Sequence, residues 1–214
     1  MIIHLIKKDI LLIKNYLILF PIFSIAISLF VSSKITLAGM DYLGLLISEV
    51  LITFIFYGSV SIKEQKTKGS ILICTTPYTR KLFVISKYLF ILTLFVSCLL
   101  IYVLTSFFNF THLPPVTITS VGISLLIIAI YFGISIPLEF KFGYDATRYI
   151  TVIAVMSSTF LLPLILKWLA ENNIDLGNLH IPTFMGQIVL YVTSFVIYYV
   201  SIVVSINIYS RKNL

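Results

Sequence analysis

The sequence predicts an all-α integral membrane protein, with six transmembrane helices preceded by a short N-terminal helix on the cytoplasmic side. Three observations indicate this fold: an apolar composition, six long apolar stretches, and a very uneven distribution of basic residues. Of the 214 residues, 59% are hydrophobic and 11% are charged, and the mean hydropathy is +1.09. A soluble domain has roughly 25% charged residues, so a chain of this composition needs lipid to cover part of its apolar surface.

A transmembrane helix needs about 20 mostly apolar residues, and six stretches of this chain meet that requirement. These stretches cover residues 16–37, 43–62, 83–107, 117–138, 149–167 and 185–209. We expect them to form a single transmembrane domain over residues 1–214, with the connection 63–82 as its main cytoplasmic segment.

Basic residues are concentrated in alternate connections of the chain. Thirteen of the fifteen Lys and Arg residues lie in the N-terminal segment, in the second–third connection with the start of the third span, in the fourth–fifth connection and in the C-terminal tail. The other connections contain Lys34 and Lys167. Because basic loops remain on the cytoplasmic side, both termini are predicted to be cytoplasmic, and this requires an even number of spans.

Several other protein classes are disfavoured by the same sequence. The net charge of +7 does not indicate a nucleic-acid-binding protein, because the basic residues flank apolar stretches instead of lying on one soluble face. The sequence contains no G-x-x-x-x-G-K-[ST], H-E-x-x-H or G-x-S-x-G motif. His4, His112 and His180 lie in three separate segments, which argues against a shared metal site. We therefore expect no catalytic residues, no metal and no bound cofactor in this chain.

Residues 1–15 are too short and too charged to span a membrane. In a helix, Ile2, Ile6 and Ile13 share one face, while His4 and Lys8 lie roughly opposite. This pattern predicts an amphipathic helix in the inner interface, with its lysines reaching the lipid headgroups. The alternative is that this segment is merely the polar start of the first span.

Two predicted cytoplasmic connections differ in character. The connection from Lys63 to Lys81 has polar ends, an apolar middle, and Gly69 and Pro77 as breaks. It is either a short amphipathic helix that presents a surface to a soluble partner or an ordinary basic loop. The connection 139–148 has four charges that sum to zero, which favours local pairing or a docking contact. Within it, Asp145 and Arg148 have the spacing of a helical ion pair.

These connections resemble those of ABC-2 type transporter permeases. The family pattern in the first connection is an acidic residue, a basic residue followed by Gly-Ser, a Pro-x-x-Arg element and a Lys in the next helix. The matching residues are Glu64, Lys68, Gly69, Ser70, Thr76, Pro77, Tyr78, Arg80 and Lys87. Lys8-Asp9 and the second connection look like a Gram-positive branch that includes permeases similar to exporters of phenol-soluble modulins and related membrane-active peptides. In the second connection the relevant residues are Phe142, Gly143, Tyr144, Asp145 and Arg148.

The resemblance implies a permease subunit of an ATP-driven exporter in the cell membrane of a bacterium. Two such subunits would pair, as a homodimer or a heterodimer, and each would dock a separate cytoplasmic ATPase that binds ATP and Mg. Residues 64–81 would couple the permease to that ATPase, and 139–148 would form a secondary contact. The cargo would be an amphipathic or antimicrobial-type peptide. The alternative is a non-transporting immunity or accessory protein that binds a partner in the membrane.

Glu49 lies within the second predicted span, toward its outer half. A carboxylate in hydrocarbon costs on the order of several kcal/mol unless it is protonated, paired or hydrated, so such residues usually face a bundle interior or a cavity. In the exporter interpretation, Glu49 lines the translocation path and meets cationic groups of the substrate. The alternative is that the span begins later and Glu49 lies near the headgroups.

Overall fold

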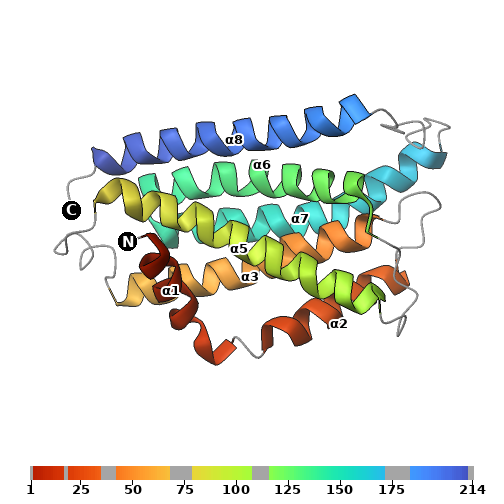
Figure 1. Cartoon of the computed structure of the whole chain (residues 1–214), viewed down its shortest axis with the longest axis horizontal. Helices are drawn as coiled ribbons and strands as arrows, with labels where there is room; N and C mark the ends of the chain where they lie inside the picture. Colours follow the sequence, from red (N-terminus) through yellow and green to blue (C-terminus); the bar gives the residue numbers. More distant parts are fainter. Residues whose placement is uncertain are drawn as a thin grey trace.

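The computed structural model describes residues 2–16, 19–34, 42–67, 79–107, 116–171 and 184–211. Within these ranges every regular element is a helix, which confirms the all-α prediction. The helices, shown in Figure 1, are α1 (Ile2–Leu12), the 3-10 helix η1 (Lys14–Tyr16), α2 (Leu19–Lys34), α3 (Tyr42–Lys66), α5 (Arg80–Phe107), α6 (Ile118–Phe142), α7 (Tyr144–Glu171) and α8 (Phe184–Ser210).

Each of the six predicted spans overlaps one of these helices. By length and composition, α5, α6, α8 and the Leu45–Lys66 part of α3 are able to cross a membrane. Helix α2 contains the shorter apolar stretch Leu19–Phe30. Helix α7 is 28 residues long and covers the predicted fifth span. The four long apolar helices support a multi-pass membrane protein, while the crossing of α2 and α7 stays a prediction.

The long helices run side by side, and α1 lies across one end of the bundle (Figure 1). The most extensive packing is between α6 and α8, and α2 packs on α3 and α5. Helix α1 contacts α5 and, less extensively, α3. A helix at residues 2–12 agrees with the prediction for residues 1–15, whereas its location in the membrane interface stays a prediction.

Gly143 separates α6 from α7. Its φ of 87° lies in the region that glycine adopts without the steric cost of a side chain, and its amide donates to the Glu139 carbonyl at 2.8 Å. At the other end of α6, the Thr117 and Ser120 side chains form a reciprocal capping box. The break at Gly143 starts α7 at Tyr144, five residues before the predicted span at 149, and brings this turn to the end of α3.

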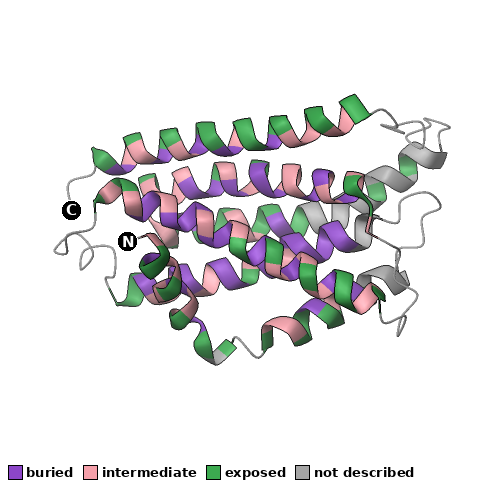
Figure 2. Cartoon of the chain, viewed as in Figure 1, coloured by how far each residue is buried: buried purple, intermediate pink, exposed green. Residues whose placement is uncertain are grey.

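Helix α8 has a polar buried face and an apolar exposed face, as Figure 2 shows by its alternating burial. Its buried residues are Ser194, Tyr198, Ser201, Ser205 and Tyr209. The Tyr88 hydroxyl of α5 hydrogen-bonds to the hydroxyls of Ser201 at 2.6 Å and Ser205 at 2.7 Å. This pattern is the reverse of that in a soluble protein and suits helices that are surrounded by lipid.

Candidate functional site

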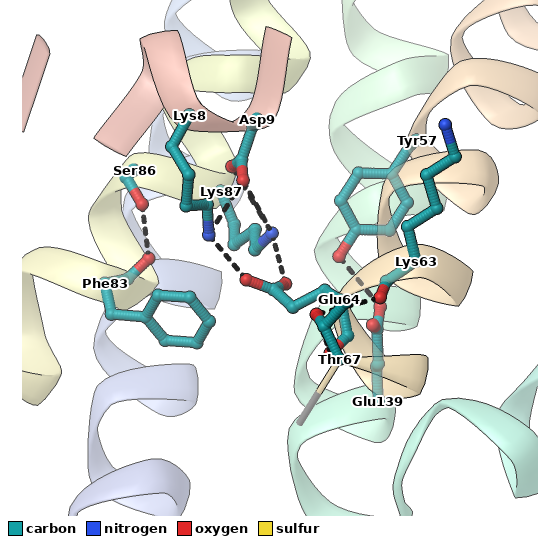
Figure 3. A network of polar contacts seen from close by, with 10 residues as sticks. All are labelled: Lys8, Asp9, Tyr57, Lys63, Glu64, Thr67, Phe83, Ser86, Lys87 and Glu139. Atoms are coloured by element: carbon teal, nitrogen blue, oxygen red, sulfur yellow. Dashed lines mark hydrogen bonds and ion pairs between the residues drawn. The ribbon is translucent and has the colours of Figure 1, made fainter. Parts of the chain in front are cut away.

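Four charged side chains from three helices meet at the end of the bundle where α1 lies. Figure 3 shows Lys8 and Asp9 of α1, Glu64 of α3 and Lys87 of α5 facing one another. The Glu64 carboxylate accepts from Lys8 at 2.6 Å through one oxygen and pairs with Lys87 at 2.5 Å through the other. Lys87 lies 3.3 Å from both Asp9 oxygens, and Lys8 is 3.0 Å from Asp9 Oδ1. We call these four residues the charge cluster.

The charge cluster is largely shielded from solvent. The side chains of Asp9, Lys87 and Glu64 are 0%, 3% and 10% exposed, and that of Lys8 is 32% exposed. The cluster contains two positive and two negative charges, so its formal charges balance. Each ion loses several kcal/mol of hydration on burial, and only close pairing offsets that loss. The arrangement therefore requires all four residues to be present and fixes α1 against both α3 and α5.

Lys63 and Phe83 make further contacts around α1. The Lys63 ammonium donates to the carbonyl of Leu12 at 2.6 Å and lies over the Tyr16 ring, 4.7 Å from its centroid. A cation at the carboxyl end of a helix also interacts favourably with the helix dipole. Under the charge cluster, the Phe83 ring lies within 5.5 Å of the ammonium groups of Lys8 and Lys87, a geometry that favours cation–π attraction.

The orientation of α1 differs from the predicted amphipathic face. We expected Lys8 to reach the lipid headgroups, and that expectation is wrong, because Lys8 points to Glu64. The buried positions are Leu5, Asp9 and Ile13, which follow one another at intervals of four residues. The buried side of α1 therefore contains Asp9, whose carboxylate pairs with Lys87.

The 139–148 connection contacts the last turns of α3. The Tyr57 hydroxyl donates to Glu139 Oε2 at 2.8 Å, and the Gln65 amide donates to Asp145. The Tyr144 hydroxyl lies so close to Gly58 that a Cβ built there would be 3.3 Å from it. Burial and, after it, the charge of Glu139 raise the pKa of the Tyr144 phenol, so this hydroxyl stays a hydrogen-bond donor at neutral pH.

The expected Asp145–Arg148 pair is replaced by a contact between elements, because the partner of Asp145 is on α3. Phe142, Asp145 and Arg148 are exposed, and Gly143 and Tyr144 are half-buried. The proposed secondary contact thus has an exposed surface next to the end of α3.

The predicted coupling residues divide into two groups. Glu64 lies in the charge cluster, and Arg80 opens α5 and donates to the Ser210 carbonyl of α8 at 3.2 Å. The other six, Lys68, Gly69, Ser70, Thr76, Pro77 and Tyr78, lie outside the described residues. Helix α3 ends two residues after Glu64, and α5 begins seven residues before Lys87.

Glu49 lies far from the charge cluster and has an opposite environment. Its side chain is 0% exposed within the apolar stretch of α3, and neither carboxylate oxygen has a hydrogen-bond partner among the described residues. The Thr53 hydroxyl, one turn along α3, is also buried and makes no hydrogen bond to the part of the chain that the structure describes. The Cys98 thiol of α5, near Glu49, lies 3.5 Å from the Ser24 hydroxyl of α2. This site favours the interpretation in which Glu49 faces the interior of the bundle.

Helices with apolar outer faces, joined at one end by a buried charge cluster, define a multi-pass membrane protein whose N-terminal helix is tied to the bundle. The family model described as ABC-2 family transporter protein matches residues 4–210. The chain therefore belongs to this family, whose members are membrane transport components, and the resemblance to ABC-2 permeases is confirmed. Neither the curated proteins nor the solved structures gave a significant match. The peptide-exporting branch stays a prediction.

Proposed function

We propose that this chain is the membrane-spanning permease subunit of an ATP-binding-cassette exporter. It forms half of the translocation path and works with a separate cytoplasmic ATPase, which binds the ATP and Mg. The observation that supports this function best is the family match over residues 4–210, because it covers the transmembrane helices together with the connection between α3 and α5.

The charge cluster supports a specific route for coupling. In this proposal the ATPase docks on the 63–82 connection, next to Glu64 in the last turn of α3. A displacement of that connection acts directly on Glu64, whose two oxygens are paired with Lys8 and Lys87 at 2.5–2.6 Å. Since those lysines belong to α1 and α5, the three helices move as one unit. The exposed residues of 139–148 form the secondary contact.

The remaining parts of the proposal concern membrane orientation, assembly and cargo. Both termini and the charge cluster face the cytoplasm of a bacterial cell, as the distribution of basic residues predicts. Two permease subunits pair, because a path for a large amphiphile needs more than one bundle of this size. The cargo is an amphipathic peptide, and the buried, unpartnered Glu49 lines the path and meets its cationic groups.

The first experiment tests recruitment of the ATPase. The chain is co-expressed with an ATPase encoded beside it, and the two are co-purified in detergent, with residues 70–80 either native or scrambled. The matched control scrambles 172–182, a connection of the same length on the predicted outer side. We expect the first scramble to abolish binding and the control to retain it. Binding at wild-type affinity after the 70–80 scramble would refute the coupling assignment, and a wild-type chain that recruits no ATPase would favour the non-transporting accessory protein.

A further inference from the structure

A cavity of about 160 Å³ lies next to the charge cluster, between α3, α5, α6, α8 and the start of α7. One water molecule needs about 10–15 Å³ of such volume, so the cavity has room for several waters or for a small polar group. The polar side chains that line it include Tyr57, Ser61, Glu64, Lys87, Glu139, Tyr144 and Tyr209. Exposed Gln65 also borders it, so the cavity lies close to the end of the bundle.

Glu139 adds to this cavity a carboxyl group that has no ion-pair partner among the described residues. The charges of the cluster balance, since Glu64 and Asp9 are paired with Lys8 and Lys87. Within the described residues, no basic group lies within ion-pair distance of Glu139. Its hydrogen bond comes from the neutral Tyr57 hydroxyl, and Lys87 acts on it only over a longer distance. The cavity and the cluster together therefore have a formal charge of −1.

A second observation is an unsatisfied hydroxyl in the wall of the same cavity. Ser61 is 2% exposed, and its hydroxyl lies beside Tyr57 and Glu139 but makes no hydrogen bond of ordinary geometry with any described residue. A buried polar atom without a partner costs about 1–3 kcal/mol, which a hydrogen-bonding ligand would remove. A carboxyl group and a hydroxyl in one cavity favour a ligand that is cationic and donates hydrogen bonds.

We propose that this cavity is a vestibule that binds an alkylammonium group. An ammonium has three donors and no acceptor, which suits the Glu139 carboxylate and the Ser61 hydroxyl. It also balances the formal charge of the cavity and the cluster. That the ammonium belongs to a lysine of the exported peptide, entering from the cytoplasm, rests on the proposed function. Binding of the group itself follows from the cavity alone.

Charge-selective thiol labelling in lipid nanodiscs tests the vestibule without any ATPase. The reporter is Ser61→Cys in a chain with Cys74→Ser and Cys98→Ala. It is reacted with aminoethyl methanethiosulfonate, which is cationic, and with sulfonatoethyl methanethiosulfonate, which is anionic. Thr67→Cys, exposed at the end of α3 and outside the cavity lining, is the matched control. Gln65→Cys, at an exposed position of the lining, is the second reporter if Ser61→Cys does not fold.

We expect the cation-to-anion rate ratio at the cavity reporter to exceed that of the control about tenfold, as one focused charge would produce. Adding Glu139→Gln lowers this ratio to the control value, and lysine ethyl ester slows cationic labelling more than the same concentration of K⁺ does. Equal ratios at the two positions, no reaction at either cavity reporter, or a ratio unchanged by Glu139→Gln would overturn the vestibule. Stronger protection by K⁺ would overturn the alkylammonium assignment.

These results are separate from the proposed function. If the labelling succeeds and no ATPase is recruited, the vestibule stands and the cargo assignment falls. If the ATPase is recruited and the labelling fails, the exporter stands without this cation site.

Discussion

Helix α3 contains two buried carboxylates with opposite surroundings, Glu49 and Glu64. They are separated by about 22 Å along the helix axis, at 1.5 Å per residue. Glu64 is paired through both oxygens with lysines from two other helices, whereas neither oxygen of Glu49 has a partner among the described residues. The difference teaches that burial alone does not define the role of a charge in this bundle. Glu64 joins three helices through its ion pairs, while Glu49 is buried within α3 without such a pair among the described residues.

The largest effect on stability is expected at the paired carboxylate. Glu64→Ala leaves Lys8 and Lys87 close together with Asp9 as their one remaining counter-ion in the cluster. Breaking a buried pair of this kind costs about 3–5 kcal/mol, so the melting temperature in detergent, followed by circular dichroism, should fall steeply. An unchanged melting temperature for Glu64→Ala would remove the structural role of the cluster.

The unpaired carboxylate should respond in the opposite direction. Glu49→Leu removes two buried oxygens that have no partner among the described residues. A buried polar group without a partner costs about 1–3 kcal/mol, so the melting temperature of this variant should be higher than that of the wild type. Glu49→Gln should lower export while folding and ATPase recruitment persist. A loss of stability in Glu49→Leu as large as that of Glu64→Ala would show that the two carboxylates do not differ, and export unchanged by Glu49→Gln would remove Glu49 from the mechanism.

A neutral polar contact gives an intermediate case. Tyr88→Phe removes the hydroxyl that joins α5 to Ser201 and Ser205 of α8. Ser201 keeps its hydrogen bond to the Gly133 carbonyl, so the expected loss is about 1–2 kcal/mol, measured by the same unfolding assay. A loss equal to that of Glu64→Ala would mean that charge adds nothing to the contacts between these helices.

The smallest effect is expected at the exposed contact between α3 and α7. Gln65→Ala removes the hydrogen bond to Asp145, and both residues are exposed. Surface substitutions of this kind usually change stability by less than about 0.5 kcal/mol. A larger fall in melting temperature would place the α3–α7 contact, along with the charge cluster, among those that hold this end of the bundle together.

The positions of the helices could be predicted from the sequence better than their ends. Hydropathy placed a span at 43–62, and α3 extends to Lys66 because Lys63 and Glu64 make contacts with α1 that keep the last turn helical. The predicted start at 149 missed the first residues of α7. Because residues 144–148 are polar, the hydropathy pattern did not include them in the span, although they begin the helix that Gly143 separates from α6.

The candidate site could be predicted only in part. The family pattern had marked Lys8, Asp9, Glu64 and Lys87 separately, but a sequence pattern does not pair side chains from three helices. Lys8, Lys63 and Lys87 were counted among the basic residues that predict membrane orientation. In the structure all three bind partners inside the protein. In the sequence, Glu139 lies in a connection whose four charges sum to zero. The cavity that Glu139 lines is formed by residues of several helices, including α3, α6 and α8, and a sequence pattern does not predict it.

The most direct test of the account measures ATP hydrolysis by the partner ATPase when it is reconstituted with the permease. The comparison uses equal amounts of folded wild type, the 70–80 scramble and Glu64→Gln. The account predicts stimulation by the wild type and no binding to the scramble. It predicts that Glu64→Gln binds the ATPase but fails to stimulate it, because the connection is no longer joined to α1 and α5. Full stimulation by Glu64→Gln would contradict the coupling role of the charge cluster.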